Sequence, residues 1–160
     1  MYKRQDIYRG WAGKPNGKGL WKEEGVPSEI KMNSAGFRDY ERSKNKPENG
    51  LRIALLEDSY TGVLQVKLED TYGAIMEEKL QRCPVLKNQK VEVINFGISG
   101  HSTAQELMTL RHHVWDYSHF NKELRQVFFA ITRVWCRKSF PSLFEMTTST
   151  RFSHISFLCR

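Results

Sequence analysis

The chain has 160 residues, enough for one domain with a substantial hydrophobic core. Its hydrophobic fraction of 39% and charged fraction of 27% are typical of a globular protein and exclude a disordered chain. No run approaches the roughly 18 uninterrupted apolar residues that a transmembrane helix needs, so no membrane span is expected.

The first residues, MYKRQDIYRGW, carry charge but lack the apolar stretch of a signal peptide. The expected location is therefore the cytoplasm. The cysteines and histidines show no spacing typical of a metal site, and we expect neither a metal nor an organic cofactor.

The net charge of +7 is unevenly distributed. Residues 118–160 contain seven basic and only two acidic side chains. A basic excess can favour nucleic acid, but these residues form no stripe, and no recognition helix or aromatic RNA-binding motif accompanies them. Nucleic-acid association through this segment is the weakest of three functional hypotheses.

Residues 1–50 are rich in turn-forming residues, with short strand-like pieces such as SEIKMN between the turns. They predict an irregular or hairpin-like lead-in that packs on the main domain. Residues 51–117 predict that main domain. A buried strand is expected over 51–57, a helix over 68–83, a second strand over 91–96, and a helix that Ser102 or Thr103 caps.

The order strand, helix, strand, helix favours right-handed βαβ units, and thus an α/β fold with a parallel sheet flanked by helices. The composition changes after residue 117. In the basic segment 118–160 only the apolar run 127–131 predicts a further strand, and the rest has no clear period.

Two unusual loops follow the two predicted strands: EDSYTG at 57–62 and GISGHST at 97–103. Both lie at carboxyl ends of strands, where parallel sheets form their sites. Ser59 there could present its hydroxyl for nucleophilic attack, and Gly97 and Gly100 could let the backbone approach a ligand closely. The alternative is that Asp58 and Ser59 simply end a strand and the glycines turn the chain.

Four stretches in order, KMNSAGFRDYE, RIALLEDSYTG, LEDTYGAIMEEKL and VEVINFGISGHSTAQELMTLR, resemble the SGNH (GDSL-type) hydrolase family over roughly residues 9–117. The resemblance implies a three-layer, flavodoxin-like α/β fold and hydrolysis of acyl or acetyl esters of small molecules, carbohydrates or lipids, without cofactor. It makes Ser59 the catalytic nucleophile and gives the oxyanion hole the N–H groups of Ser59 and Gly100. Glu57, Asp58 and His101 would lie near the site.

The sequence departs from the family pattern in two places. Glu57 stands where the family usually has glycine. The family's Gly-x-Asn-Asp and Asp-x-x-His blocks are missing. The last aspartate of the chain is Asp116, and the residue three positions before His154, where the family has aspartate, is Arg151. Nothing assigns the base role to His101. We therefore expect a fold that is incomplete at its C-terminal side and weak or no turnover.

Two explanations for the missing blocks stay open: true divergence, or a truncated or frameshifted product after codon 117. A second functional hypothesis also follows from the missing base. The chain would then be a non-catalytic module that binds a carbohydrate or acylated ligand on the same fold.

Overall fold

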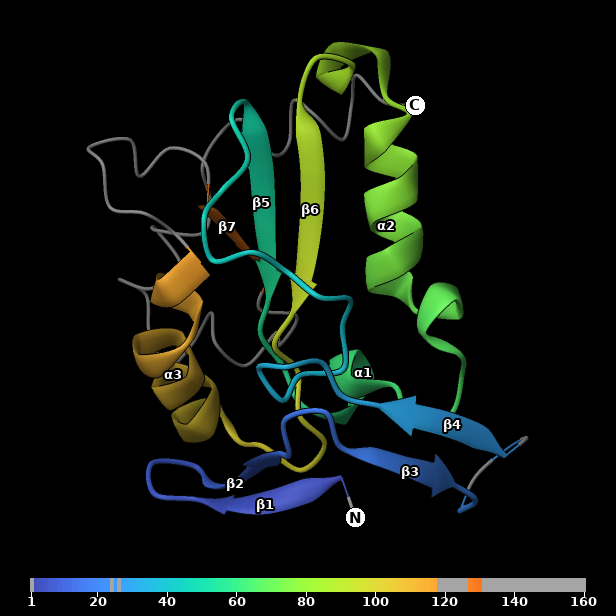
Figure 1. Cartoon of the computed structure of the whole chain (residues 1–160), viewed down its shortest axis with the longest axis vertical. Coiled ribbons are helices and arrows are strands. Elements are labelled where there is room, and N and C mark those ends of the chain that lie inside the picture. The colour runs from blue at the N-terminus through green and yellow to red at the C-terminus, as the bar shows by residue number, and fades with distance from the viewer. Residues whose placement is uncertain (1, 24, 26, 118–126, 131–160) are drawn as a thin grey trace.

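The computed structural model describes residues 2–23, 25, 27–117 and 127–130. It is a mixed α/β structure with a parallel sheet and two antiparallel strand pairs (Figure 1). In chain order its elements are β1 (Lys3–Asp6), β2 (Gly10–Gly13), β3 (Lys18–Trp21), β4 (Ser28–Lys31), β5 (Gly50–Leu55), α1 (Ser59–Gly62), η1 (Leu68–Asp70), α2 (Tyr72–Gln81), η2 (Pro84–Leu86), β6 (Lys90–Asn95), α3 (Thr103–His112), η3 (Val114–Tyr117) and β7 (Val127–Ala130).

The parallel sheet has the order β6-β5-β7. All six residues of β5 are buried, as expected for a central strand covered on both faces. The register aligns Arg52 of β5 with Glu92 of β6 and with Val127 of β7. The strands expected over 51–57 and 91–96 are thus present, each one residue earlier at its start.

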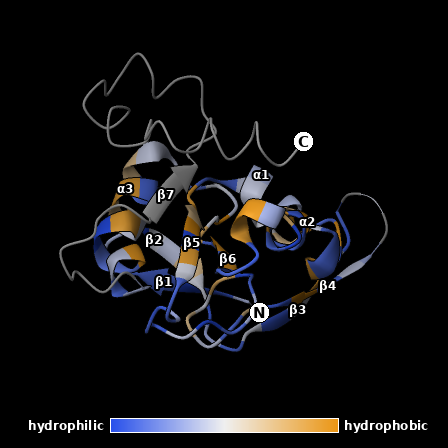
Figure 2. Cartoon of the chain, turned by 90° about the horizontal axis from the view of Figure 1, so that it is seen from above, coloured by the Kyte–Doolittle hydropathy of each residue, from blue (hydrophilic) through white to orange (hydrophobic). Residues whose placement is uncertain are grey.

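Alternate residues of β5 and β6 build two hydrophobic clusters, because successive side chains of a strand point to opposite faces. One cluster contains Leu51, Ile53 and Leu55 with Met76 and Leu80 of α2. The other combines Ala54, Leu56, Ile94 and Phe96 with Phe37, Leu110 and Val114. Helix α2 therefore covers one face and α3 with η3 the other, and Figure 2 shows the hydrophobic residues gathered on β5 and β6 between them.

The helix expected over 68–83 is divided into η1 and α2, and η2 follows as a separate element. The Thr71 side chain caps α2 by accepting from the Ala74 N–H, and Pro84 begins η2. Gly73 is the residue of α2 that is buried, and a Cβ there would lie 3.1 Å from Leu55 Cδ1. The helix thus approaches the sheet at a glycine, which leaves Tyr72 and Ile75 more exposed than their helical spacing predicted.

The outer edge of β6 is hydrogen-bonded by side chains instead of a further strand. Three of its N–H groups, on alternate residues, donate to carboxylate or amide oxygens at 2.6–3.2 Å. The pairs are Val91 with Gln81, Val93 with Glu77, and Asn95 with Asp39. These side chains satisfy an edge that would otherwise be open to pairing with another strand.

The N-terminal pairs, β1 with β2 and β3 with β4, are both antiparallel. In Figure 1 they lie across the carboxyl ends of β5 and β6, next to α1. Gly13 and Gly36 fix one contact in this region, because a Cβ on Gly13 would lie 2.0 Å from the carbonyl oxygen of Gly36. The lead-in therefore covers the end of the sheet at which the two candidate loops emerge.

Candidate functional site at the carboxyl ends of β5 and β6

The two candidate loops run side by side. Beyond the strands, Phe96 N–H donates to the Leu55 carbonyl at 2.9 Å, and Ile98 N–H donates to the Glu57 carbonyl at 3.1 Å. The parallel ladder thus continues into both loops. The segments 57–62 and 97–101 are therefore held together by backbone hydrogen bonds.

Ser59 is the first residue of α1 and is exposed. The preceding Asp58 is buried, and its side chain accepts from the Tyr60 N–H at 3.1 Å, which fixes the turn from strand to helix. The Ser59 hydroxyl forms no hydrogen bond with another residue in the described part of the chain. The turn thus presents Ser59 to solvent on a rigid, buried support.

Gly100 occupies a turn that requires glycine. His101 N–H donates to the Ile98 carbonyl at 3.1 Å across this turn, and Gly100 has a φ of +87°. A positive φ at the third residue is the signature of a type II turn, in which glycine is favoured. A Cβ at Gly100 would also lie 3.2 Å from the indole ring of Trp11.

The N–H groups of both residues are available to a ligand. The N–H of Ser59 has no partner within α1, because the first N–H groups of a helix never have one. Among the described residues, neither the Ser59 N–H nor the Gly100 N–H donates a hydrogen bond elsewhere. Backbone N–H groups without a protein partner can donate to an oxygen of a ligand.

Asn95, at the end of β6, connects the two loops. Its amide donates to the carbonyl oxygens of Thr61 at 2.9 Å and Arg38 at 3.1 Å. Its carbonyl oxygen accepts from the Gly97 N–H at 2.8 Å. The contact is close, because a Cβ on Gly97 would lie 2.6 Å from Thr61 Cβ. This buried side chain fixes the spacing of the serine turn and the glycine loop.

The Glu57 side chain is buried and engaged with α1. It accepts from the Thr61 hydroxyl at 3.2 Å, and that hydroxyl is also hydrogen-bonded to the Tyr72 hydroxyl. Burial raises the pKa of Tyr72; the hydrogen bond to Thr61 works against this and the charge of Glu57 adds to it. The carboxylate at this departure from the family pattern therefore has a structural partner.

His101 is buried against β2. Its Nε2 lies 3.0 Å from the Trp11 carbonyl oxygen, and its ring meets the Trp11 ring edge-on at 5.5 Å. Burial lowers the pKa of His101, so the ring is neutral near pH 7 and donates from Nε2. The structure thus commits this nitrogen to the lead-in.

The other described histidines are also engaged away from Ser59. His112 stacks on Tyr8 with ring centroids 4.0 Å apart, and His113 packs edge-on against Phe37. Within the described ranges, no histidine or carboxylate is hydrogen-bonded to the Ser59 hydroxyl. His154 lies outside the described residues.

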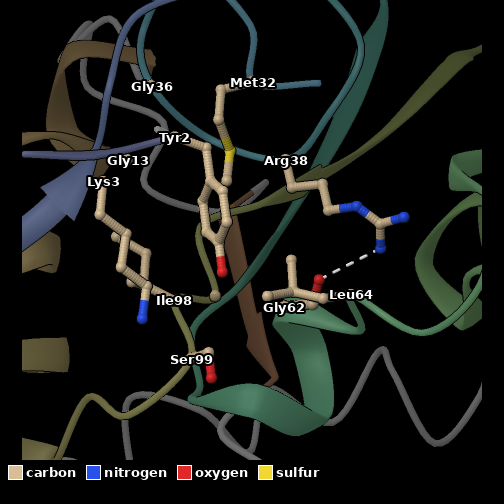
Figure 3. Close-up of a pocket in the computed structure, with 11 residues that line it drawn as sticks. Tyr2, Lys3, Gly13, Met32, Gly36, Arg38, Gly62, Leu64, Ile98 and Ser99 are labelled. Carbon is tan, nitrogen blue, oxygen red and sulfur yellow. Dashed lines mark hydrogen bonds between the residues drawn. The ribbon is translucent and has the colours of Figure 1, made fainter. Parts of the chain in front are cut away.

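A pocket opens beside these loops (Figure 3). It holds about 330 Å³ of empty space, which includes its open mouth. Gly62 and Leu64, at and after the end of α1, line it together with the segment Gly97–Ser99. The remaining lining residues are Tyr2, Lys3 of β1, Gly13 of β2 and three residues of the loop after β4. Ser59 and Gly100 do not line it.

Arg38 was not singled out by sequence reasoning. This buried side chain donates to the Gly62 carbonyl at 3.3 Å and also to the carbonyls of Val63 and Val66. Burial lowers the pKa of its guanidinium. Arg38 and Asn95 thus hold the serine turn and the chain that follows it. For Asn95 the sequence signal was a polar residue near the end of the apolar run VEVINF.

In the part of the chain that the structure describes, no group of three or more histidine, cysteine, aspartate or glutamate side chains could hold a metal ion. Nor is any described helix both long and apolar enough to cross a membrane. A scan against protein-family models and a search of the curated proteins find no match for this chain.

Proposed function

We propose that this chain carries an SGNH-type hydrolase domain that hydrolyses carboxylic esters, with Ser59 as its nucleophile. The observation that carries the proposal is the placement of the exposed Ser59 and the Gly100 turn on two hydrogen-bonded loops at the carboxyl ends of adjacent parallel strands. The uncommitted N–H groups of both residues support it.

The sheet order adds support for a three-layer, flavodoxin-like fold. Numbered among the parallel strands only, the order β6-β5-β7 is second, first, third, which is how the doubly wound 2-1-3-4-5 order begins. Ligands bind such sheets where the strand order reverses, outside the carboxyl ends. Ser59 follows β5, the strand at which this sheet reverses.

In the proposed reaction, Ser59 Oγ attacks the acyl carbon while its proton passes to a base. The N–H groups of Ser59 and Gly100 donate to the negatively charged oxygen of the tetrahedral intermediate. The intermediate expels the alcohol, which takes up the proton, and water then releases the acid from the serine.

The described residues contribute the nucleophile and the oxyanion donors but no base hydrogen-bonded to Ser59. Loss of a triad member typically lowers the rate by about 10⁴-fold or more. We therefore propose weak turnover for this chain.

Hydrolysis of p-nitrophenyl acetate tests this directly. Ser59→Ala should abolish whatever activity above background is present, whereas Ser99→Ala, a serine of the neighbouring loop, should keep it. Activity that survives Ser59→Ala would refute Ser59 as the nucleophile. Fast turnover that depends on Ser59 would refute the claim that the chain lacks a catalytic base.

A second candidate is a non-catalytic module that binds a carbohydrate or an acylated ligand at the same loops. The commitment of His101 Nε2 to Trp11 favours it, because the histidine nearest in sequence to the glycine loop is thereby engaged elsewhere. A fluorophosphonate probe separates the candidates, since it labels only an activated serine hydroxyl.

A further inference from the structure

Helix α1, which begins at Ser59, is too short to be stable by itself. It spans four residues. Its backbone hydrogen bonds run from the Gly62 N–H to the Asp58 carbonyl and from the Val63 N–H to the Ser59 carbonyl, both at 2.9 Å. An isolated helix shorter than about 12 residues is marginal in water. Contacts with the rest of the fold must therefore fix the direction of α1.

The residue that follows α1 also depends on such contacts. Val63 has a φ of 31° and a ψ of 65°, in the left-handed region that a β-branched residue rarely adopts. Such a conformation persists only where the surrounding structure imposes it. The Arg38 guanidinium supplies part of this constraint, because it donates to the carbonyl oxygens of Gly62 and Val63; Figure 3 shows it directed toward Gly62.

Thr61 connects the inside of α1 to the neighbouring segments and is only 1% exposed. Its carbonyl accepts from the Asn95 amide at 2.9 Å, and a Cβ on Gly97 would lie 2.6 Å from its own Cβ. Its hydroxyl donates to Glu57 Oε2 at 3.2 Å and is also hydrogen-bonded to the hydroxyl of Tyr72, the first residue of α2. Thr61 is therefore the residue through which β5, β6 and α2 hold the serine turn.

The direction of the hydrogen bonds in this network follows from its protons. A carboxylate only accepts, so the Thr61 hydroxyl gives its single proton to Glu57. The Thr61 oxygen then remains as an acceptor, and the Tyr72 hydroxyl must donate to it. Burial raises the pKa of Tyr72, which keeps this donor protonated. The Thr61 hydroxyl is thus held from both sides in one orientation.

We propose that Thr61 is a positioning residue for Ser59, and that Glu57 and Tyr72 act through it. The Ser59 hydroxyl has no hydrogen bond to a described residue that could hold it, so its direction depends on the backbone of α1. The network fixes that backbone, and with it the Ser59 N–H. Glu57 thereby gains a role that glycine at this position could not fill, because glycine has no side chain to accept from Thr61.

The importance of this positioning for ester hydrolysis rests on the proposed function. A displacement of the reacting atom by about 1 Å can lower a rate by about 100-fold. A loosened α1 should therefore affect the reactivity of Ser59 more strongly than the stability of the fold. This difference separates a positioning role from a merely structural one.

The rate at which a fluorophosphonate labels Ser59 in the full chain, measured together with amide hydrogen exchange of Gly62 and Val63, tests the inference. Thr61→Val keeps the shape of the side chain but removes its hydroxyl. It should slow the labelling by about tenfold to 100-fold and speed the exchange of both amides by about tenfold. Thr61→Ser keeps the hydroxyl and should restore most of the labelling rate.

Tyr72→Phe distinguishes a network from independent contacts. It removes only the outer donor, at an exposed residue, and should slow the labelling by about threefold. In a chain that already carries Thr61→Val, the same substitution should have no further effect, because its partner is gone. Additive effects of the two substitutions would contradict the network.

Thr109→Val is the matched control. Thr109 is also 1% exposed, and its hydroxyl donates to the Gln105 carbonyl of α3 at 2.9 Å. Its loss should change neither the labelling nor the exchange of Gly62 and Val63.

Labelling that Thr61→Val leaves unchanged, or that Thr109→Val slows equally, would overturn the inference. If Thr61→Val does not fold, an unchanged labelling rate in Tyr72→Phe would do the same. A chain whose Ser59 is never labelled would refute the proposed hydrolase instead. In that case the exchange of Gly62 and Val63 decides: faster exchange in Thr61→Val would retain Thr61 as the residue that holds the turn, and unchanged exchange would refute it.

Discussion

At the scale of single residues, the candidate site depends on buried polar side chains and on glycines. The single side chain of Asn95 is hydrogen-bonded to Thr61 of the serine turn, Gly97 of the glycine loop and Arg38 of the lead-in. Ser59 itself makes no side-chain hydrogen bond to a described residue, so its position is set by these neighbours. The residues that build the site are thus not those that would perform its chemistry.

Asn95→Ala should lower the free energy of unfolding by about 2–4 kcal/mol, because it leaves buried backbone groups without partners. Urea denaturation measures the change. Asn88→Ala, at an exposed asparagine before β6, should cost less than about 0.5 kcal/mol. Equal effects of the two substitutions would show that the Asn95 bridge does not contribute to stability.

Gly97→Ala should destabilise the fold by about 1–3 kcal/mol, because the new methyl group would lie 2.6 Å from Thr61 Cβ. Gly62→Ala, whose new methyl group would have the Ser99 nitrogen at 3.3 Å as its nearest contact, should cost less. Thermal unfolding of the two variants measures the difference in stability. A Gly97→Ala variant as stable as the original chain would mean that the loops are not in close contact.

At the scale of elements, β5 and β6 are joined by a buried ion pair on adjacent strands. Arg52 Nε lies 2.6 Å from Glu92 Oε2. The same guanidinium donates to the carbonyls of Ser43, Lys44, Asn45 and Tyr117. Arg52 therefore fastens the lead-in and the end of η3 to the central strand.

Arg52→Leu should lower the free energy of unfolding by about 3–5 kcal/mol, since it leaves Glu92 buried without its main partner. Lys90, which is exposed and lies 3.3 Å from Glu92 Oε1, provides the control. Lys90→Gln should cost no more than about 1 kcal/mol. If both substitutions lower the free energy of unfolding equally in urea denaturation, the buried Arg52–Glu92 pair does not stabilise the fold more than the exposed Lys90–Glu92 pair.

At the end of α3, His113 should make the stability depend on pH. Burial, and then the charge of Arg9, lower its folded-state pKa to about 4 from an ordinary value of 6.5. The neutral ring is favoured in the fold, so its contribution is complete above pH 6.5 and is lost as the pH falls toward 4. His113→Gln should therefore flatten the decline in urea midpoint between pH 7 and pH 4.5. An unchanged slope would contradict the lowered pKa.

At the scale of the whole molecule, the sequence predicted the parallel strands and the loops that follow them. Short, largely apolar runs bounded by turn-forming residues, such as 51–57, favour strands covered on both faces, and a glycine such as Gly100 favours a turn at positive φ. The contacts of His101 with Trp11 and of Arg38 with Gly62 were not predictable, because they join residues far apart in the chain. The pocket between the lead-in and the loops was missed for the same reason.

The basic segment 118–160, with its missing family blocks, leads to a prediction about the gene. If the reading frame shifted, translation of one of the other two frames after codon 117 should yield Gly-x-Asn-Asp followed by Asp-x-x-His. DNA sequencing across codons 115–160 provides the frames. Absence of both motifs from both frames would leave true divergence as the explanation.

The central claim is that the serine turn and the glycine loop make Ser59 a nucleophile. Reaction of the intact chain with a fluorophosphonate, read by mass spectrometry of its peptides, tests this most directly. We expect a slow single adduct on Ser59 that is lost in Ser59→Ala and retained in Ser99→Ala. No adduct, or an adduct that persists in Ser59→Ala, would contradict it.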